Sequence, residues 1–123
     1  MNAETVPVLH ICVSCRAGLP LGLGEVPLGA QLHAAIGKHA GAAVRLREVL
    51  CLANCARGCS AAISAAGKWT YLLGGLRPGQ AADLLAYAES YAASPNGTVL
   101  PSRRPQSLRD AVLGRIPPSE GLL

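Results

Sequence analysis

All five cysteines of this 123-residue chain fall in two short groups, and this clustering constrains the chain more than any other feature. The first group is CVSC, with Cys12 and Cys15. The second is CLANCARGC, whose nine residues hold Cys51, Cys55 and Cys59. Thiols at such spacing are typical of disulfides, a zinc site, a redox-active dithiol or an iron–sulfur cluster.

The odd number of cysteines argues against a framework built only of disulfides. The first ten residues, MNAETVPVLH, lack the basic and apolar regions of a signal peptide. No apolar run approaches the roughly 20 residues that cross a bilayer. We therefore expect a cytoplasmic protein without a membrane partner, whose thiols stay reduced and bind metal or do redox work.

The amino-acid composition excludes several classes of function. Half of the residues are hydrophobic and 15% are charged, which is typical of a folded domain with one core. The net charge of +4 comes with one Trp, three Tyr and no Phe, so base stacking has little support and we expect no nucleic-acid partner. Paired carboxylates, a Ser-His-Asp set and a phosphate loop are all absent, which favours an electron carrier or metal-binding protein over an enzyme.

Hydrophobic periodicity predicts the order of elements. Alternation predicts four strands, and apolar residues at helical spacing predict helices over residues 28–40 and 77–94. The first strand–helix–strand unit needs a crossover and predicts a parallel pair, whereas the short Ala66-Gly67 link predicts a hairpin. The expected fold is a thioredoxin-like α/β domain with a small mixed four-stranded sheet flanked by two helices. The predicted strands lie within residues 7–13, 42–52, 60–65 and 68–74.

The C-terminal residues differ in composition from the rest of the chain. Residues 98–123 are rich in Pro and Arg and follow the turn cluster Ser94-Pro95-Asn96-Gly97. We expect residues 1–97 to form the thioredoxin-like domain. Residues 98–123 are expected to be an extension packed on that domain, with a helical turn around Leu108 to Leu113.

A [2Fe–2S] cluster accounts best for the two cysteine groups. Such a cluster takes four thiolates, and Cys12 with Cys15 would bind one iron while Cys51 with Cys55 bind the other. Arg16 and Arg57 would offset the negative charge of the cluster, although ordinary solvated arginines explain them equally well. Gly58 would let backbone N–H groups turn toward sulfur. The surplus thiol, Cys59, is a small buried hydrophobe, an alternate ligand or a reactive thiol.

Two other interpretations of the thiols stay open. The same cysteines could hold one zinc ion, or another divalent metal, in a tetrahedral site. CVSC at the end of a first strand also suggests a dithiol reductase. The resemblance to thioredoxins implies a cis-proline facing that pair, but the chain has no proline between Pro27 and Pro78.

The second cysteine group and the residues after it resemble the thioredoxin-like [2Fe–2S] ferredoxins. The segment CLANC, a glycine, a hairpin and GKWTYLLGGLRPGQAADLL carry the resemblance, which covers roughly residues 6 to 94. The resemblance implies that Cys51 and Cys55 bind one iron, and it is consistent with a homodimer. The chain departs from that family in its closely spaced first pair and in having Gly58-Cys59 where Gly-Pro is common.

The whole chain also resembles an uncharacterised bacterial family of predicted metal-binding proteins with a domain of unknown function. The matching motifs are CVSCR, CLANCARGC, GKWTYLLGGL, ESYAASPNGTV and RRPQSLRDAVLGRIPP. This resemblance implies metal or cluster binding. It also implies, more weakly, that genes of this family lie near genes for cobalamin synthesis. If the arginine-rich tail docks a partner, the charges would steer an acidic redox protein toward it.

Overall fold

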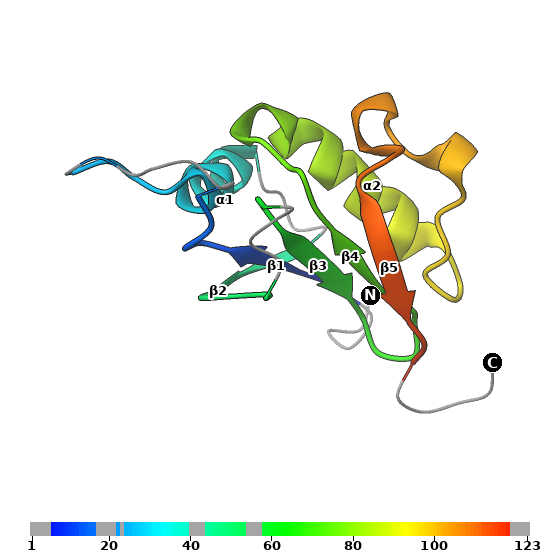
Figure 1. Cartoon of the computed structure of the whole chain (residues 1–123). Helices are drawn as coiled ribbons and strands as arrows, with labels where there is room; N and C mark the ends of the chain where they lie inside the picture. Colours follow the sequence, from blue (N-terminus) through cyan, green and yellow to red (C-terminus); the bar gives the residue numbers. More distant parts are fainter. Residues whose placement is uncertain (1–5, 17–21, 23, 40–43, 54–57, 119–123) are drawn as a thin grey trace.

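The computed structural model describes residues 6–16, 22, 24–39, 44–53 and 58–118. In this part of the chain, one mixed β-sheet packs against two α-helices (Figure 1). The elements in chain order are β1 (Val8–Cys12), α1 (Leu28–His39), β2 (Arg45–Val49), β3 (Ala61–Ser64), β4 (Thr70–Leu73), η3 (Pro78–Gln80), α2 (Ala81–Ala93), η4 (Pro101–Arg103), η5 (Gln106–Leu108) and β5 (Val112–Ile116). The four strands and two helices that periodicity predicts are all present.

The sheet combines one parallel pair with three antiparallel pairs in the order β2-β1-β3-β4-β5. β1 and β2 are parallel, as their crossover through α1 requires, and β1 pairs antiparallel with β3. The turn between β3 and β4 contains Gly67 at φ +73°, a conformation that glycine adopts without strain. The predicted crossover and hairpin are therefore confirmed.

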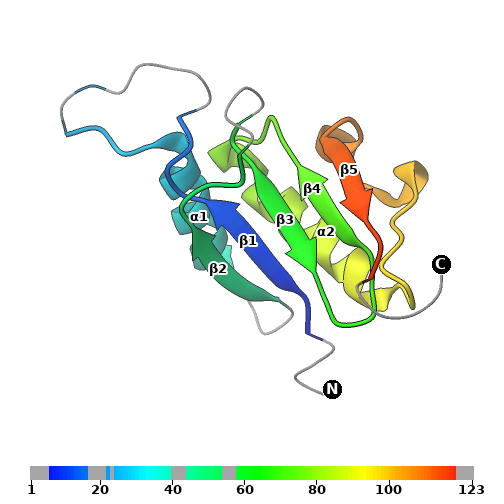
Figure 2. The same cartoon turned by 60° about the horizontal axis from the view of Figure 1, so that its bottom comes forward.

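Both helices cover the same face of the sheet, as two views agree (Figures 1 and 2). Alternate strand residues point to this face and are buried, because a strand directs successive side chains to opposite sides. Apolar residues of α1 and α2 at helical spacing complete the core. The buried residues of this layer include Leu9, Ile11, Ile63, Tyr71, Leu73, Leu32, Ile36, Leu84, Tyr87 and Tyr91. No helix among the described residues is long and apolar enough to span a membrane.

The last part of the chain adds a fifth strand, so the expected four-stranded sheet is corrected. β5 pairs antiparallel with β4, and the Gly74 N–H donates to the Ala111 carbonyl at 2.9 Å where the two strands meet. The helical turn expected near Leu108 to Leu113 is limited to η5, which ends at Leu108, and β5 begins at Val112. Pairing with β4 satisfies backbone groups that an edge strand would leave open. The division at residue 97 stays a prediction.

The loop after α2 is anchored by a close approach to the β3–β4 hairpin. The Trp69 N–H donates to the Asn96 carbonyl at 2.9 Å, and the Tyr91 hydroxyl donates to the Trp69 carbonyl at 2.6 Å. Gly97 has φ +82°, and a Cβ there would lie 2.8 Å from the Tyr91 ring. Glycine is therefore required where the chain leaves α2 and starts toward β5.

Candidate metal centre

Four of the five cysteines lie at one edge of the sheet because of strand direction. Cys12 ends β1, and Cys51 follows β2 by two residues, so the parallel strands bring both to the same edge. β3 runs antiparallel to β1, so its first residues lie at this edge as well, and Cys59 precedes β3 by two residues. Loops at strand ends are where such sheets carry their functional groups. Cys55 and Arg57 lie outside the described residues.

The loop that contains Cys12 and Cys15 is tied to the strands on both sides of β1. The Cys12 N–H donates to the Ser60 carbonyl at 3.1 Å, and the Val13 N–H donates to the Val49 carbonyl at 2.9 Å. The Cys12 Sγ lies 3.5 Å from the Leu50 carbonyl oxygen, to which the Ser14 hydroxyl also donates. These bonds place the first thiol next to the segment that leads into Cys51.

Helix α1 packs its first turn directly on this loop. The Gly29 N–H donates to the Cys15 carbonyl at 2.9 Å, so the helix start holds the loop through its backbone. A Cβ at Gly29 would lie 1.9 Å from the Cys12 carbonyl oxygen, closer than atoms can approach. The absence of a side chain at Gly29 is therefore a condition for placing Cys12 and Cys15 where they are.

Cys59 lies next to Cys12 and Cys15 and belongs to the hydrophobic core. Its side chain is fully buried, and Cys12 and Cys15 are each 5% exposed. Burial raises the pKa of Cys59 to about 11, with further contributions from the Cys15 charge and hydrogen bond and from the Cys12 charge. The backbone of Cys59 is bonded to Leu76, whose N–H donates to the Cys59 carbonyl at 3.1 Å. The structure thus brings together Cys12, Cys15 and Cys59.

Cys51 differs from these three thiols because it is exposed. Its Sγ accepts a hydrogen bond from the Ala53 N–H at 3.1 Å, in a turn where Ala53 has φ +56°. A backbone N–H directed at sulfur stabilises a thiolate and tunes a metal bound to it. The Cys51 loop is therefore shaped to present a solvent-accessible sulfur.

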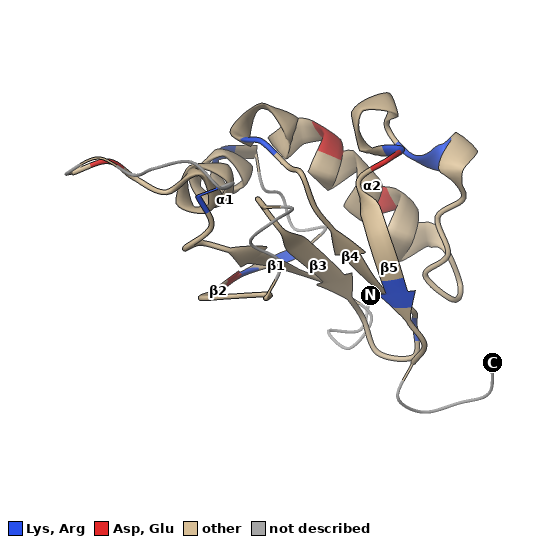
Figure 3. Cartoon of the chain, in the orientation of Figure 1, with Lys and Arg blue, Asp and Glu red and all other residues tan. Residues whose placement is uncertain are grey.

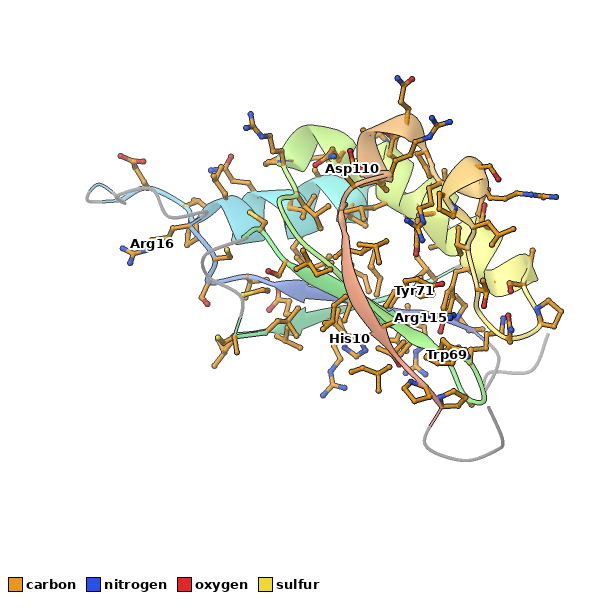
Figure 4. All side chains as sticks on the ribbon, turned by 45° about the vertical axis from the view of Figure 1, so that its right-hand side comes forward. His10, Arg16, Trp69, Tyr71, Asp110 and Arg115 are labelled. Atoms are coloured by element: carbon orange, nitrogen blue, oxygen red, sulfur yellow. The ribbon has the colours of Figure 1, made fainter. Side chains whose placement is uncertain are left out.

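Arg16 and Gly58, which the sequence predicts to lie around the thiols, differ in exposure. Arg16 is exposed and follows Cys15, and Gly58 is half-buried beside Cys59. Lys and Arg are spread over the ribbon instead of gathering at the cysteine edge (Figure 3). Figure 4 shows Arg16 at the end of the molecule near the start of α1, directed away from the sheet. Arg16 can therefore act on this edge only through a solvent-screened charge.

The donors at this edge fit a thiophilic centre by their chemistry. All four described donors are sulfur, and soft thiolates bind zinc and iron–sulfur clusters. Within the described ranges, no three Cys, His, Asp or Glu side chains are arranged to share one metal ion. A complete site on this edge thus needs Cys55 or an adjustment of the loops.

Comparisons with known proteins agree with this fold. The order of strands and the two helices on one face of the sheet define a thioredoxin-like α/β domain. The chain resembles the solved structure of a thioredoxin-like [2Fe–2S] ferredoxin from Aquifex aeolicus with a TM-score of 0.55 and 15% identity, over 94% of this chain and 97% of that one. At this identity the likeness shows a shared fold. No curated protein sequence matches the chain.

The family is defined by a match over residues 9–118. The chain belongs to the family described as "Protein of unknown function (DUF1636)". This match includes all five cysteines, both helices and all five strands except Val8, the first residue of β1.

Sequence reasoning missed two features of this site. The first is the position of Cys59, which lies next to the first cysteine pair although it is distant from that pair in the chain. The second is Gly29, whose close approach to the Cys12 carbonyl makes room for the loop. A glycine at the second position of a helix gave a weak signal, because it lowers helix propensity without forming a turn.

Proposed function

We propose that this protein is a small electron carrier that holds one [2Fe–2S] cluster between its two cysteine loops. Cys12 and Cys15 would bind one iron, and Cys51 and Cys55 would bind the other. The observation that carries the proposal is the short distance, 3.5 Å, between the Cys12 sulfur and the carbonyl of Leu50, the residue before Cys51. The resemblance to a ferredoxin fold supports the same assignment.

The residues of the chain would give the two halves of this site different tasks. Cys12 and Cys15 are buried against the helix face, where low dielectric and fixed backbone would hold their half rigid. Cys51 is exposed and would supply the side through which electrons enter and leave. When bound, a cluster of this kind accepts and returns single electrons, at a potential set by hydrogen bonds to sulfur and by solvent exposure.

The charges of the chain bear on its partner. Arg16 and Arg57 would lower the negative charge of the site, and the net charge of +4 would favour an acidic redox protein. Such steering acts on the rate of association and weakens with salt. We place this exchange in the cytoplasm, where the free thiols would stay reduced.

A second candidate function is a metal-handling protein, and one observation favours it. Cys12, Cys15 and Cys59 are all buried, and Cys15 and Cys12 both contribute to the raised pKa of Cys59, so the three thiols are neighbours that would have to move together to bind one ion. With Cys51 or Cys55 as a fourth ligand, they could hold a single zinc, cobalt or iron ion. In that role the protein would bind and release a metal and would carry no electron.

Cysteine-to-serine variants separate the two functions. Each of Cys12→Ser, Cys15→Ser, Cys51→Ser and Cys55→Ser should lose iron and acid-labile sulfide after anaerobic purification, whereas Cys59→Ser should retain both. Loss of a single bound metal in Cys59→Ser, with no sulfide in the parent protein, would instead support metal handling. If the parent protein binds neither metal nor sulfide yet reduces a disulfide, the dithiol reductase alternative gains and both metal functions fail.

A further inference from the structure

A pocket of about 300 Å³ lies on the other half of the sheet from the cysteines. It is formed by β4, β5 and the segment that returns from α2, and its polar side chains are Tyr71, Thr98, Arg104 and Arg115. Val99 and Val112 contribute apolar surface. Small-molecule sites commonly combine such an apolar lining with a few converging polar groups.

Arg104 is fixed in this pocket by carbonyl groups. Its Nε donates to the Val99 carbonyl at 3.0 Å, and its Nη1 donates to the Arg109 carbonyl at 3.2 Å. These two bonds engage two of the five N–H donors of the guanidinium. The side chain is therefore held in position, while its remaining donors and its full charge stay available.

Arg115, the second arginine that lines the pocket, is oriented by different contacts. Its guanidinium lies over the Trp69 ring, 4.0 Å from the ring centre, and its Nη1 approaches the Thr98 hydroxyl at 3.4 Å. Arg115 is directly opposite Tyr71 in the β4–β5 register, and Figure 4 shows the three side chains Trp69, Tyr71 and Arg115 together. Stacking on an aromatic ring orients the planar guanidinium without neutralising it.

Within the described part of the chain, no carboxylate lies within ion-pair distance of Arg104 or Arg115. The Tyr71 hydroxyl accepts from the Val99 N–H at 3.3 Å, which leaves its own proton free to donate. The pocket thus offers several donors and two positive charges without an anion.

The strand register separates this pocket from the cysteine edge. Ile11, next to Cys12, pairs with Ala61, which in turn pairs with Leu73 at the end of β4. Tyr71 and Arg115 lie farther along the strands, toward the hairpin turn. A ligand in the pocket would therefore occupy a location distinct from the thiols.

We propose that this pocket binds a small organic anion through Arg104 and Arg115. The ligand would present a phosphate or carboxylate group to the two guanidinium groups and pack a short apolar body against Val99 and Val112. Planar guanidinium groups match both oxyanions in geometry and charge. The pocket would add small-molecule binding to the function that we propose for the cysteine-bearing end of the sheet.

Trp69 supplies the readout, because it is the only tryptophan in the chain and is stacked on Arg115. The intact protein, as purified, is titrated with phenyl phosphate, benzoate and inorganic phosphate at constant ionic strength, and Trp69 fluorescence is followed together with calorimetry. We expect a saturable change, and Arg115→Gln or Arg104→Gln should weaken binding about tenfold or more. Binding of phenyl phosphate but not benzoate would identify a phosphate ligand, and the converse a carboxylate.

Arg103→Gln is the matched control, because Arg103 is an exposed neighbour in the same segment and does not line this pocket. Its affinity should equal that of the parent protein. Circular dichroism checks that each variant is folded, and Arg115→Lys tests whether charge without the planar group suffices. Absence of saturable binding for all three probes, or equal weakening by Arg103→Gln, would overturn the proposal.

Discussion

Gly29 determines, at the scale of one residue, how closely α1 approaches the first cysteine loop. Replacing it with alanine should lower the free energy of unfolding by about 1–3 kcal/mol, because the new Cβ would overlap the Cys12 carbonyl. The same displacement should reduce metal content, since Cys12 and Cys15 move with the loop. Urea denaturation and metal analysis of Gly29→Ala measure both effects.

Gly37→Ala in the same helix is the control for this prediction. A Cβ at Gly37 meets nothing within 4 Å, so the variant should gain up to about 1 kcal/mol from helix propensity. Equal stability and equal metal content in Gly29→Ala and Gly37→Ala would contradict the packing that we describe.

Two tyrosines of α2 differ in one respect that can be measured. No described residue bonds to the buried Tyr87 hydroxyl, whereas the Tyr91 hydroxyl donates to the Trp69 carbonyl. An unsatisfied buried hydroxyl costs free energy, so Tyr87→Phe should leave stability unchanged or raise it by about 1 kcal/mol. Tyr91→Phe should lower it by about 1 kcal/mol, because a good hydrogen bond is lost.

The two variants control each other, since both remove one hydroxyl from a fully buried ring of the same helix. Thermal or urea unfolding gives the comparison directly. A larger loss in Tyr87→Phe than in Tyr91→Phe would mean that the Tyr87 hydroxyl has a partner and that this account of the core is wrong.

At the scale of elements, β5 covers the edge of β4. Ending the chain after Asp110 removes β5 and leaves the backbone groups of β4 exposed. We expect a lower denaturation midpoint together with concentration-dependent association, because open strand edges pair with other chains. Size-exclusion chromatography at several concentrations, combined with urea unfolding, measures both.

Leu113→Ser keeps the strand and changes one side chain that is 37% exposed. It should alter stability by no more than about 0.5 kcal/mol and should not associate. If the truncated chain were as stable and as monomeric as Leu113→Ser, β5 would not protect the sheet edge.

The sequence predicts most elements because their periodicity is local. The helix face of Leu28–His39 and the alternation of Val8–Cys12 follow from side-chain spacing alone. β5 was not predictable in the same way, since VLGRI contains a glycine and is enclosed by proline-rich segments. Its strand conformation depends on pairing with β4, which is a tertiary effect.

At the scale of the whole molecule, the cysteine edge is assembled by topology from three separate segments. The sequence contains the two cysteine groups and predicts that both lie at the ends of strands. It does not predict that Cys59 packs beside Cys12 and Cys15, because that contact requires β3 to lie antiparallel to β1. Burial of Cys59 is one of the alternatives that the sequence offers, whereas the exposure of Cys51 emerges only from the fold.

The central claim is that this edge holds an iron–sulfur cluster. Its most direct test is a visible absorption spectrum of protein purified without oxygen, with iron, acid-labile sulfide and zinc assayed on the same sample. We predict a red-brown protein with about two iron and two sulfide per chain, since four thiolates hold a cluster of that composition. A colourless protein with about one zinc and no sulfide would contradict the claim.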